Sequence, residues 1–149
     1  DNDPDTPYIL GTKLLFDSDA TGNKYCRDGI GKNTGFRTSM FGPHVIFEIP
    51  LQEIPETDNL TVEIGLHNKS QQGYTTVILA NGQEVFNKVV DKASVKKGLK
   101  FKVPVSLLKE NQLLRLEFNF PELAEEEMNL PTEERTRTLS IVSLIISEA

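Results

Sequence analysis

The strict alternation of apolar and polar residues along several segments is the feature that most limits how this chain can fold. In HVIFEIPL every second position is apolar, and these positions hold Val45, Phe47, Ile49 and Leu51. The polar residues His44, Glu48 and Gln52 fall on the other face. Successive side chains of a β-strand point to opposite sides, so this period of two predicts a strand with one buried face. LTVEIGLH, LKFKVPV and LLRLEFNF repeat the pattern.

Turn and edge signals connect the alternating segments. Asn81-Gly82 separates two apolar runs in YTTVILANGQEVFNKVV, and both residues tolerate the positive φ of a type I′ turn, so we expect a β-hairpin. Pro104 in LKFKVPV indicates a strand end or an edge strand, because proline cannot donate to the ladder. The run LSIVSLIIS is apolar on both faces, which favours a central strand.

Helical patterns are short: none is longer than LAEEEMNL, and SLLKENQ has room for one turn. Seven or more short strands therefore predict an all-β fold, an antiparallel β-sandwich of jelly-roll type. The chain has 149 residues, 38% of them hydrophobic, so we expect a single domain over residues 1–149 with a frayed N-terminal segment at 1–10. The predicted core includes Val45, Phe47, Val62, Ile64, Leu116, Phe118, Leu139 and Ile141.

The charge balance argues against several classes of partner. The net charge is −6 and the pI about 5.0, so no overall basic field attracts nucleic acid. The longest apolar run, LSIVSLIISEA, is shorter than the roughly 20 residues of a membrane-spanning helix, and we expect no membrane insertion. Glutamates gather in PELAEEEMNLPTEERTR, which we expect to be a solvated surface segment. Because the chain begins DNDPDTP, without methionine or signal peptide, we expect an excised module or a processed product.

DSDATGNKYCRDG, residues 17–29, has the spacing of a calcium loop. Positions one, three, five, six and twelve hold Asp17, Asp19, Thr21, Gly22 and Asp28. Neither flank is helical, position twelve holds aspartate where glutamate is usual, and Lys24 and Arg27 oppose a cation. We therefore predict no resident metal but a turn, with backbone amides bonded to Asp17, Asp19 and Asn23. Weak calcium binding is the alternative.

The segment from Gly22 to Gly42 is rich in glycine and poor in apolar residues, so we expect a long, ordered and functional Gly-rich loop. Its aromatic rings suit stacking on sugars, and its guanidinium, carboxylate and amide groups suit hydrogen bonds to hydroxyl groups. The alternative is that the aromatic rings plug one end of the sandwich. The predicted ligand-binding residues are Tyr25, Arg27, Asp28, Asn33, Phe36 and Arg37.

Few residues suit catalysis or cofactor binding. His44 and His67 fall at outward strand positions, and Ser39 in RTSMFG lacks the flanking glycines of a hydrolase nucleophile. Cys26 is the single cysteine, and we expect it to be structural. GIGKNTG lacks the spacing and the helix of a phosphate loop. We therefore expect no enzyme activity and no cofactor, with a hydrolase built from two carboxylates as a distant alternative.

Four short motifs follow one another between Phe16 and Ile146. They are VILANGQEV, FKVPVSLL, LLRLEFNF and RTRTLSIVSLII. In this order they resemble the accessory jelly-roll domain of some bacterial surface-glycan glycosyltransferases and phosphoglycerol transferases. The recurring features are the Asn81-Gly82 hairpin, Pro104 and Arg137-Thr138-Leu139. The chain departs from that family in having Ser140 as the next residue and no tryptophan before the second strand.

The resemblance implies a non-catalytic carbohydrate-associated module of an extracytoplasmic glycan-modifying protein, in the periplasm or at the cell surface. The implied partners are a glycan or phosphoglycerol-decorated polymer and a partner enzyme domain. No catalytic residues follow from the resemblance. The alternative is a structural or protein-interaction β-sandwich domain with no small-molecule ligand.

Overall fold

The chain folds as an antiparallel β-sandwich of jelly-roll type, in agreement with the alternating sequence pattern. The computed structural model describes residues 3–33, 35, 37–67, 72–108 and 111–149. One sheet has six strands in the order β3-β4-β11-β6-β9, with β1 also paired to β11. Its strands are β1 (Lys13–Leu15), β3 (Ile30–Asn33), β4 (Thr38–Phe41), β6 (Asn59–His67), β9 (Leu99–Pro104) and β11 (Arg137–Glu148).

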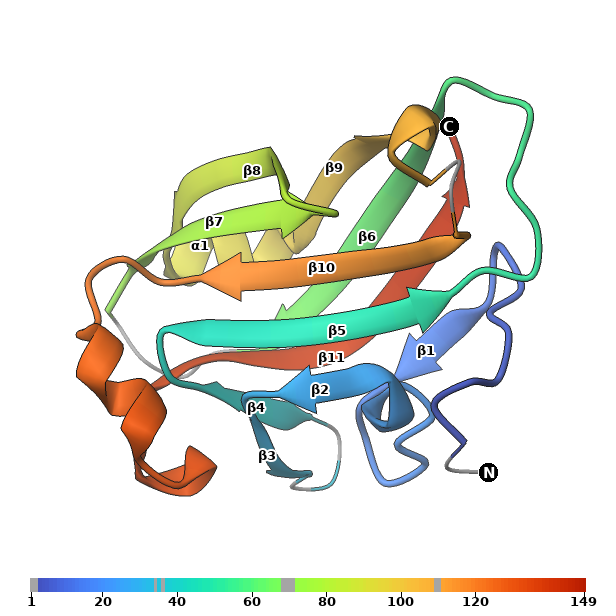
Figure 1. Cartoon of the computed structure of the whole chain (residues 1–149). Coiled ribbons are helices and arrows are strands. Elements are labelled where there is room, and N and C mark those ends of the chain that lie inside the picture. The colour runs from blue at the N-terminus through green and yellow to red at the C-terminus, as the bar shows by residue number, and fades with distance from the viewer. Residues whose placement is uncertain (1–2, 34, 36, 68–71, 109–110) are drawn as a thin grey trace.

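The second sheet has five strands in the order β2-β5-β10-β7-β8 and lies in front of the first in Figure 1. Its strands are β2 (Cys26–Asp28), β5 (His44–Pro50), β7 (Tyr74–Ala80), β8 (Gln83–Val90) and β10 (Leu113–Asn119). Strand β2 lies at the edge of this sheet, next to β5. This edge carries the candidate site.

The apolar faces of both sheets meet in one continuous core, and all eight predicted core residues are buried. The centre is aromatic: the ring centroids of Phe16 and Phe47 are 5.8 Å apart, and those of Phe47 and Phe118 are 5.9 Å apart. Both pairs are edge-to-face, the arrangement that the charge distribution of aromatic rings favours. Alternation therefore identified the buried face of β5, β9 and β10 correctly.

The predicted turn and edge features are confirmed. Asn81 and Gly82 have φ of 48° and 88° and join β7 to β8 in the expected hairpin. Pro104 is the last residue of β9, which lies at the edge of its sheet. Strand β11, apolar on both faces, pairs with β1, β4 and β6 and is central.

Helices are short and lie between strands. The α-helix α1 (Lys92–Lys97) begins after Asp91, whose side chain accepts a hydrogen bond from the Ser94 amide, as an N-cap does. The 3₁₀ helices are η1 (Asn23–Tyr25), η2 (Val105–Leu108), η3 (Glu125–Asn129) and η4 (Thr132–Glu134). The predicted single turn corresponds to η2, and the exposed glutamate-rich segment contains η3 and η4. In the described part of the chain, no helix is both long enough and apolar enough to span a membrane.

The prediction of a long loop from Gly22 to Gly42 is wrong, because this segment forms η1, β2, β3 and β4. Its strands are three or four residues long and pair with register shifts, so no alternating run is long enough to be recognised. Gly29, with φ of 98°, lies between β2 and β3, where a Cβ would be 2.9 Å from the His44 carbonyl oxygen. Glycine is therefore needed at position 29, because the backbone of His44 lies too close for a side chain.

The N-terminal segment is fastened before residue 10, contrary to the expectation of fraying over residues 1–10. Tyr8 is buried, and its backbone bonds to Pro50 and Gln52 at the end of β5. Its hydroxyl donates to the carbonyl of Thr12 and accepts a 2.8 Å hydrogen bond from the Ile146 amide. The residues from Asp3 to Leu10 thus run along the sandwich with Tyr8 as their anchor.

Candidate functional site

A cleft of about 250 Å³ lies beside the edge strand β2. We call it the β2-edge cleft, and its lining residues are Asn23, Cys26, Arg27, Asp28, Gly29, Ile30 and Thr132. The lining combines an amide, a guanidinium, a carboxylate and a hydroxyl group from three elements, η1, β2 and η4. Such a mixture of donors and acceptors suits a small, hydroxyl-bearing molecule.

Asn23 supplies the most informative atom of the cleft. Its side-chain Oδ1 is buried, and no donor within the described residues bonds to it. Buried polar atoms are nearly always paired, because leaving one unpaired costs about 1–3 kcal/mol. The prediction that Asn23 accepts from a backbone amide is therefore wrong. Among the described residues Oδ1 is thus an acceptor that lacks a partner, on a side chain that lines the cleft.

Asp28 is held in place by an ion pair with Arg135, which precedes β11. The Arg135 guanidinium lies 3.0 Å from Asp28 Oδ1, and the Arg135 side chain is 8% exposed against 35% for Asp28. Arg135 also donates to the carbonyls of Leu130 and Met128. The carboxylate is thus fixed in orientation while part of it remains open to the cleft.

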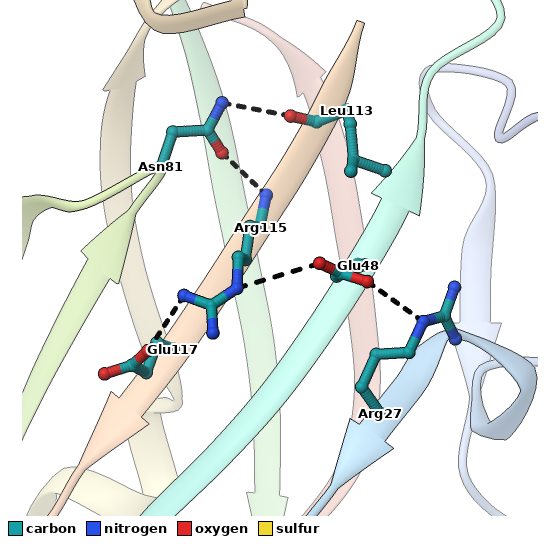
Figure 2. Close-up of polar contacts among 6 residues, drawn as sticks. All are labelled: Arg27, Glu48, Asn81, Leu113, Arg115 and Glu117. Carbon is teal, nitrogen blue, oxygen red and sulfur yellow. Dashed lines mark hydrogen bonds and ion pairs between the residues drawn. The ribbon is translucent and has the colours of Figure 1, made fainter. Parts of the chain in front are cut away.

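Arg27 joins the β2-edge cleft to the outer face of the five-stranded sheet. Its Nε donates to Glu48 Oε1 at 3.1 Å, and its Nη1 donates to the Lys24 carbonyl. Figure 2 shows that Glu48 also faces Arg115, at 3.7 Å, while Arg115 pairs with Glu117 at 2.9 Å. Arg115 and Glu48 are direct cross-strand partners, and opposite charges at such positions stabilise a sheet by about 0.2–1 kcal/mol.

Asn81 contacts the strand that carries Arg115 and Glu117. Its Oδ1 accepts a 2.7 Å hydrogen bond from the Arg115 amide, and its Nδ2 donates to the Leu107 and Leu113 carbonyls. The sequence identified Asn81 only as a turn residue. Its contacts with β10 are long-range, and no local pattern could have revealed them.

His44 lies at the other end of β5, between β10 and η3. Its Nδ1 bonds to Asn119 Oδ1, and its Nε2 lies 2.7 Å from Glu125 Oε1. Burial lowers the pKa of His44, but the hydrogen bonds to Asn119 and Glu125 and the charges of Glu125 and Glu117 outweigh it and raise the pKa above 6.5. His44 therefore attaches η3 to the sheet through its hydrogen bonds to Asn119 and Glu125.

The structure separates the six predicted ligand-binding residues. Arg27 and Asp28 both line the β2-edge cleft. Tyr25 is only 2% exposed, and its hydroxyl donates to the Thr6 carbonyl, so its ring packs in the core and is not open for stacking. Asn33 ends β3, Arg37 is half-buried just before β4, and Phe36 lies outside the described residues.

The turn predicted for residues 17–29 is confined to the segment from Asp17 to Gly22, because the residues that follow form η1 and β2. Asp17 Oδ1 accepts from the Asp19 amide at 2.9 Å, and Thr21 Oγ1 accepts from the Leu15 amide at 2.8 Å. The positive φ of the turn belongs to Ala20, at 49°, and not to Gly22, at −87°. Among the described residues, no three His, Cys, Asp or Glu side chains are placed to hold a metal ion.

Cys26 lines the β2-edge cleft, but the properties of its thiol do not favour reactivity. Burial raises the pKa of Cys26 to about 12, and Sγ donates a 3.3 Å hydrogen bond to the Asp28 carbonyl. A nucleophilic cysteine requires a lowered pKa. The predicted structural role of this residue fits both observations.

Solved structures show where this fold occurs elsewhere. The chain resembles a family 35 carbohydrate binding module from Clostridium thermocellum, with a TM-score of 0.50 and 7% identity over 93% of this chain and 99% of that one. It also resembles part of an exo-beta-1,3-galactanase from Phanerochaete chrysosporium, with a TM-score of 0.52 and 11% identity over 92% of this chain. The chain spans 29% of that galactanase. No protein-family model and no curated protein matches the chain.

Proposed function

We propose that this chain is a non-catalytic carbohydrate-binding module, with the β2-edge cleft as its sugar site. The observation that carries the proposal is the buried, unpaired Oδ1 of Asn23 in a cleft that Arg27 and Asp28 also line. Sugar hydroxyl groups both donate and accept hydrogen bonds. One can donate to Asn23 while its neighbour accepts from Arg27 and a third donates to Asp28.

The size of the cleft favours a single sugar unit. Its volume of about 250 Å³ lies just below the roughly 300–1,000 Å³ common for small-molecule sites. Asn33, Phe36 and Arg37 stay predicted contacts for the adjoining units of a longer glycan. The resemblance in fold to a carbohydrate binding module over almost the full length of both chains supports the same proposal.

The proposal includes a setting outside the cytoplasm, in a glycan-modifying protein where an enzyme domain acts on the glycan that this module holds. The Cys26 thiol, with its raised pKa, does not offer a nucleophile in the cleft. Asp28 is committed to Arg135 through one oxygen. These two features favour binding over catalysis.

The test is direct binding to neutral oligosaccharides. An array of di- to tetrasaccharides, including β-1,3-galactotriose, identifies a probe, and calorimetry measures its affinity. Arg27→Gln removes a charged donor, and we expect affinity to fall about 10- to 100-fold, since hydrogen bonds to charged groups contribute about 1.5–3 kcal/mol.

Arg115→Gln is the matched control. Both arginines pair with Glu48, but only Arg27 lines the β2-edge cleft. We expect the Arg115 variant to bind within about twofold of the parent protein. Equal losses in the two variants would place the ligand on the sheet face instead. Absence of binding to every probe would favour the structural or protein-interaction alternative.

A further inference from the structure

The outer face of the six-stranded sheet carries a second concave surface, remote from β2. This groove has a volume of about 420 Å³ and lies between α1, β6, β9, β11 and β1. We call it the lysine groove, because four lysines from three elements line it, namely Lys13, Lys96, Lys97 and Lys100.

Small residues line part of the lysine groove, namely Gly65, Gly98 and Ser143. Gly65 lies opposite Ser143, and a Cβ at Gly65 would come within 2.5 Å of Ser143 Oγ. The Ser143 hydroxyl and the backbone of β6 and β11 are therefore close to the bottom of the groove. A chain-like molecule can lie along it and reach polar groups on both sides.

Positive charge predominates in the lysine groove, although the whole protein has a net charge of −6. Glu63 is the one acidic lining residue, and it pairs with Lys100 at 3.4 Å. Within the described part of the chain, no carboxylate lies within 4.0 Å of the Nζ of Lys13, Lys96 or Lys97. Three exposed ammonium groups thus surround one groove without an acidic partner.

Helix stabilisation does not account for this arrangement. Lys96 and Lys97 are in the last turn of α1, where positive charge favours the helix dipole. Lys13, however, is on β1, and Lys100 is on β9. The dipole of α1 therefore does not explain why Lys13 and Lys100 lie beside the same groove.

We propose that the lysine groove binds a single anionic polysaccharide chain through its carboxylate or phosphate groups. Lys13 contacts the chain from the β1 side, and Lys96 and Lys97 contact it from the α1 side, while Ser143 offers a hydroxyl group at the floor. This inference goes beyond the proposed sugar site, because the lysine groove shares no residue with the β2-edge cleft.

A slender chain fits these charges better than an extended surface does. A bilayer or a duplex presents negative charge over a wide area and would meet the acidic remainder of the protein, whose repulsion acts over the Debye length of about 8 Å in physiological salt. A single nucleic-acid strand usually stacks its bases on aromatic rings, and no aromatic side chain is among the described lining residues. A polysaccharide needs only the charges and the hydroxyl group.

The experiment compares dextran derivatives that share one backbone: neutral dextran, carboxymethyl-dextran and dextran phosphate. We expect binding to one or both charged derivatives and none to neutral dextran, with affinity that falls as salt rises. The carboxymethyl and phosphate arms identify the preferred anion. Lys13→Gln/Lys97→Gln, which removes one charge from each wall, should weaken binding about tenfold or more and flatten the salt dependence.

The control pair Lys24→Gln/Lys32→Gln removes the same charge from the β2 and β3 side of the molecule. It should leave affinity within about twofold, and so should Arg27→Gln, whose effect is confined to the neutral-sugar site. Equal weakening by both lysine pairs would overturn the proposal, since only net charge would then matter. Equal binding of neutral dextran that Arg27→Gln does not weaken would overturn it as well, because that binding would lie outside the β2-edge cleft and would need no anionic group. Tighter binding to anionic vesicles or to oligodeoxythymidylate than to any dextran derivative would assign the groove to another partner and refute it.

Discussion

The guanidinium of Arg135 lies 3.0 Å from Asp28 Oδ1 and joins the segment before β11 to the edge strand β2, 107 residues away in the chain. Arg135 is almost fully buried, and two carbonyls of the glutamate-rich segment also accept from it. One side chain therefore holds the wall of the β2-edge cleft and the η3–η4 segment together. Removing a buried donor of this kind leaves all three acceptors without their partner.

We predict that Arg135→Leu loosens the η3–η4 segment while the sandwich stays folded. Amide hydrogen exchange over residues 125–136 should accelerate at least about tenfold, because charged hydrogen bonds contribute about 1.5–3 kcal/mol. Mass spectrometry of exchanged peptides measures this change. Arg137→Leu, which removes an exposed arginine nearby, is the control and should leave the rates unchanged. Unchanged exchange in the Arg135 variant would show that other contacts hold the segment.

Asn23→Ala tests whether the unpaired Oδ1 is kept for ligand binding. Because the buried atom has no protein partner among the described residues, its removal should not lower the free energy of unfolding and should raise it by up to about 1–2 kcal/mol. Sugar affinity should fall in the same variant. Urea unfolding and calorimetry measure the two quantities. A clear loss of stability would show that Asn23 is a structural residue.

The raised pKa of His44 predicts a pH-dependent contribution to stability. A protonated ring donates to both Asn119 and Glu125, so folding raises the pKa above its unfolded value of about 6.5. The stabilisation is then complete below about pH 6.5 and is lost as pH rises through the higher folded pKa. NMR titration of the His44 ring should give that higher pKa.

Urea unfolding at several pH values supplies the second half of this test. His44→Gln should remove the decline in stability above about pH 6.5, whereas His67→Gln should retain it. A titration of His44 at or below its ordinary pKa would show that the contacts with Asn119 and Glu125 do not favour the protonated ring.

Most of the fold was predictable because alternation records burial directly. Strands such as β5 and β10 are seven residues long, and buried and less buried residues alternate along them. This alternation can be recognised in neighbouring residues of the sequence. Strands β2 and β3 were missed because three or four residues with register shifts contain too little periodicity. Only their pairing with β5 and β4 makes them strands.

The candidate site was predictable only in part. The sequence indicated Arg27 and Asp28, since polar residues beside glycine are frequent in binding segments. It could not indicate Thr132, which lines the β2-edge cleft, or Arg135, which pairs with Asp28, because both lie more than 100 residues further along the chain. Tyr25 was assigned to the ligand because an aromatic residue in a polar segment has the same local pattern whether it lies inside or outside. The lysine groove likewise combines residues from β1, α1 and β9, which no local pattern connects.

Cys26 should react slowly in the folded protein. With a pKa of about 12, its thiolate fraction at pH 8 is far smaller than that of an unfolded cysteine with a pKa near 8.5. We expect iodoacetamide to label the native protein about 100-fold more slowly than the urea-unfolded protein, after allowance for the greater nucleophilicity of a high-pKa thiolate. Comparable rates in the two states would show that the thiol is ionised and accessible, and would reopen a reactive role.

Gly22→Ala should destabilise the protein through contact with Phe16 and not through backbone strain. Gly22 has φ of −87°, which alanine adopts freely, but its Cβ would lie 2.4 Å from Cζ of Phe16. Phe16 is fully buried against Phe47, so the ring cannot move aside without disturbing the core. Overpacking of this kind costs about 1–3 kcal/mol.

Combining Gly22→Ala with Phe16→Leu shortens the side chain that clashes, and the double variant should be more stable than the sum of the two single losses predicts. Urea unfolding of the four proteins measures this coupling, and strict additivity would refute the steric explanation.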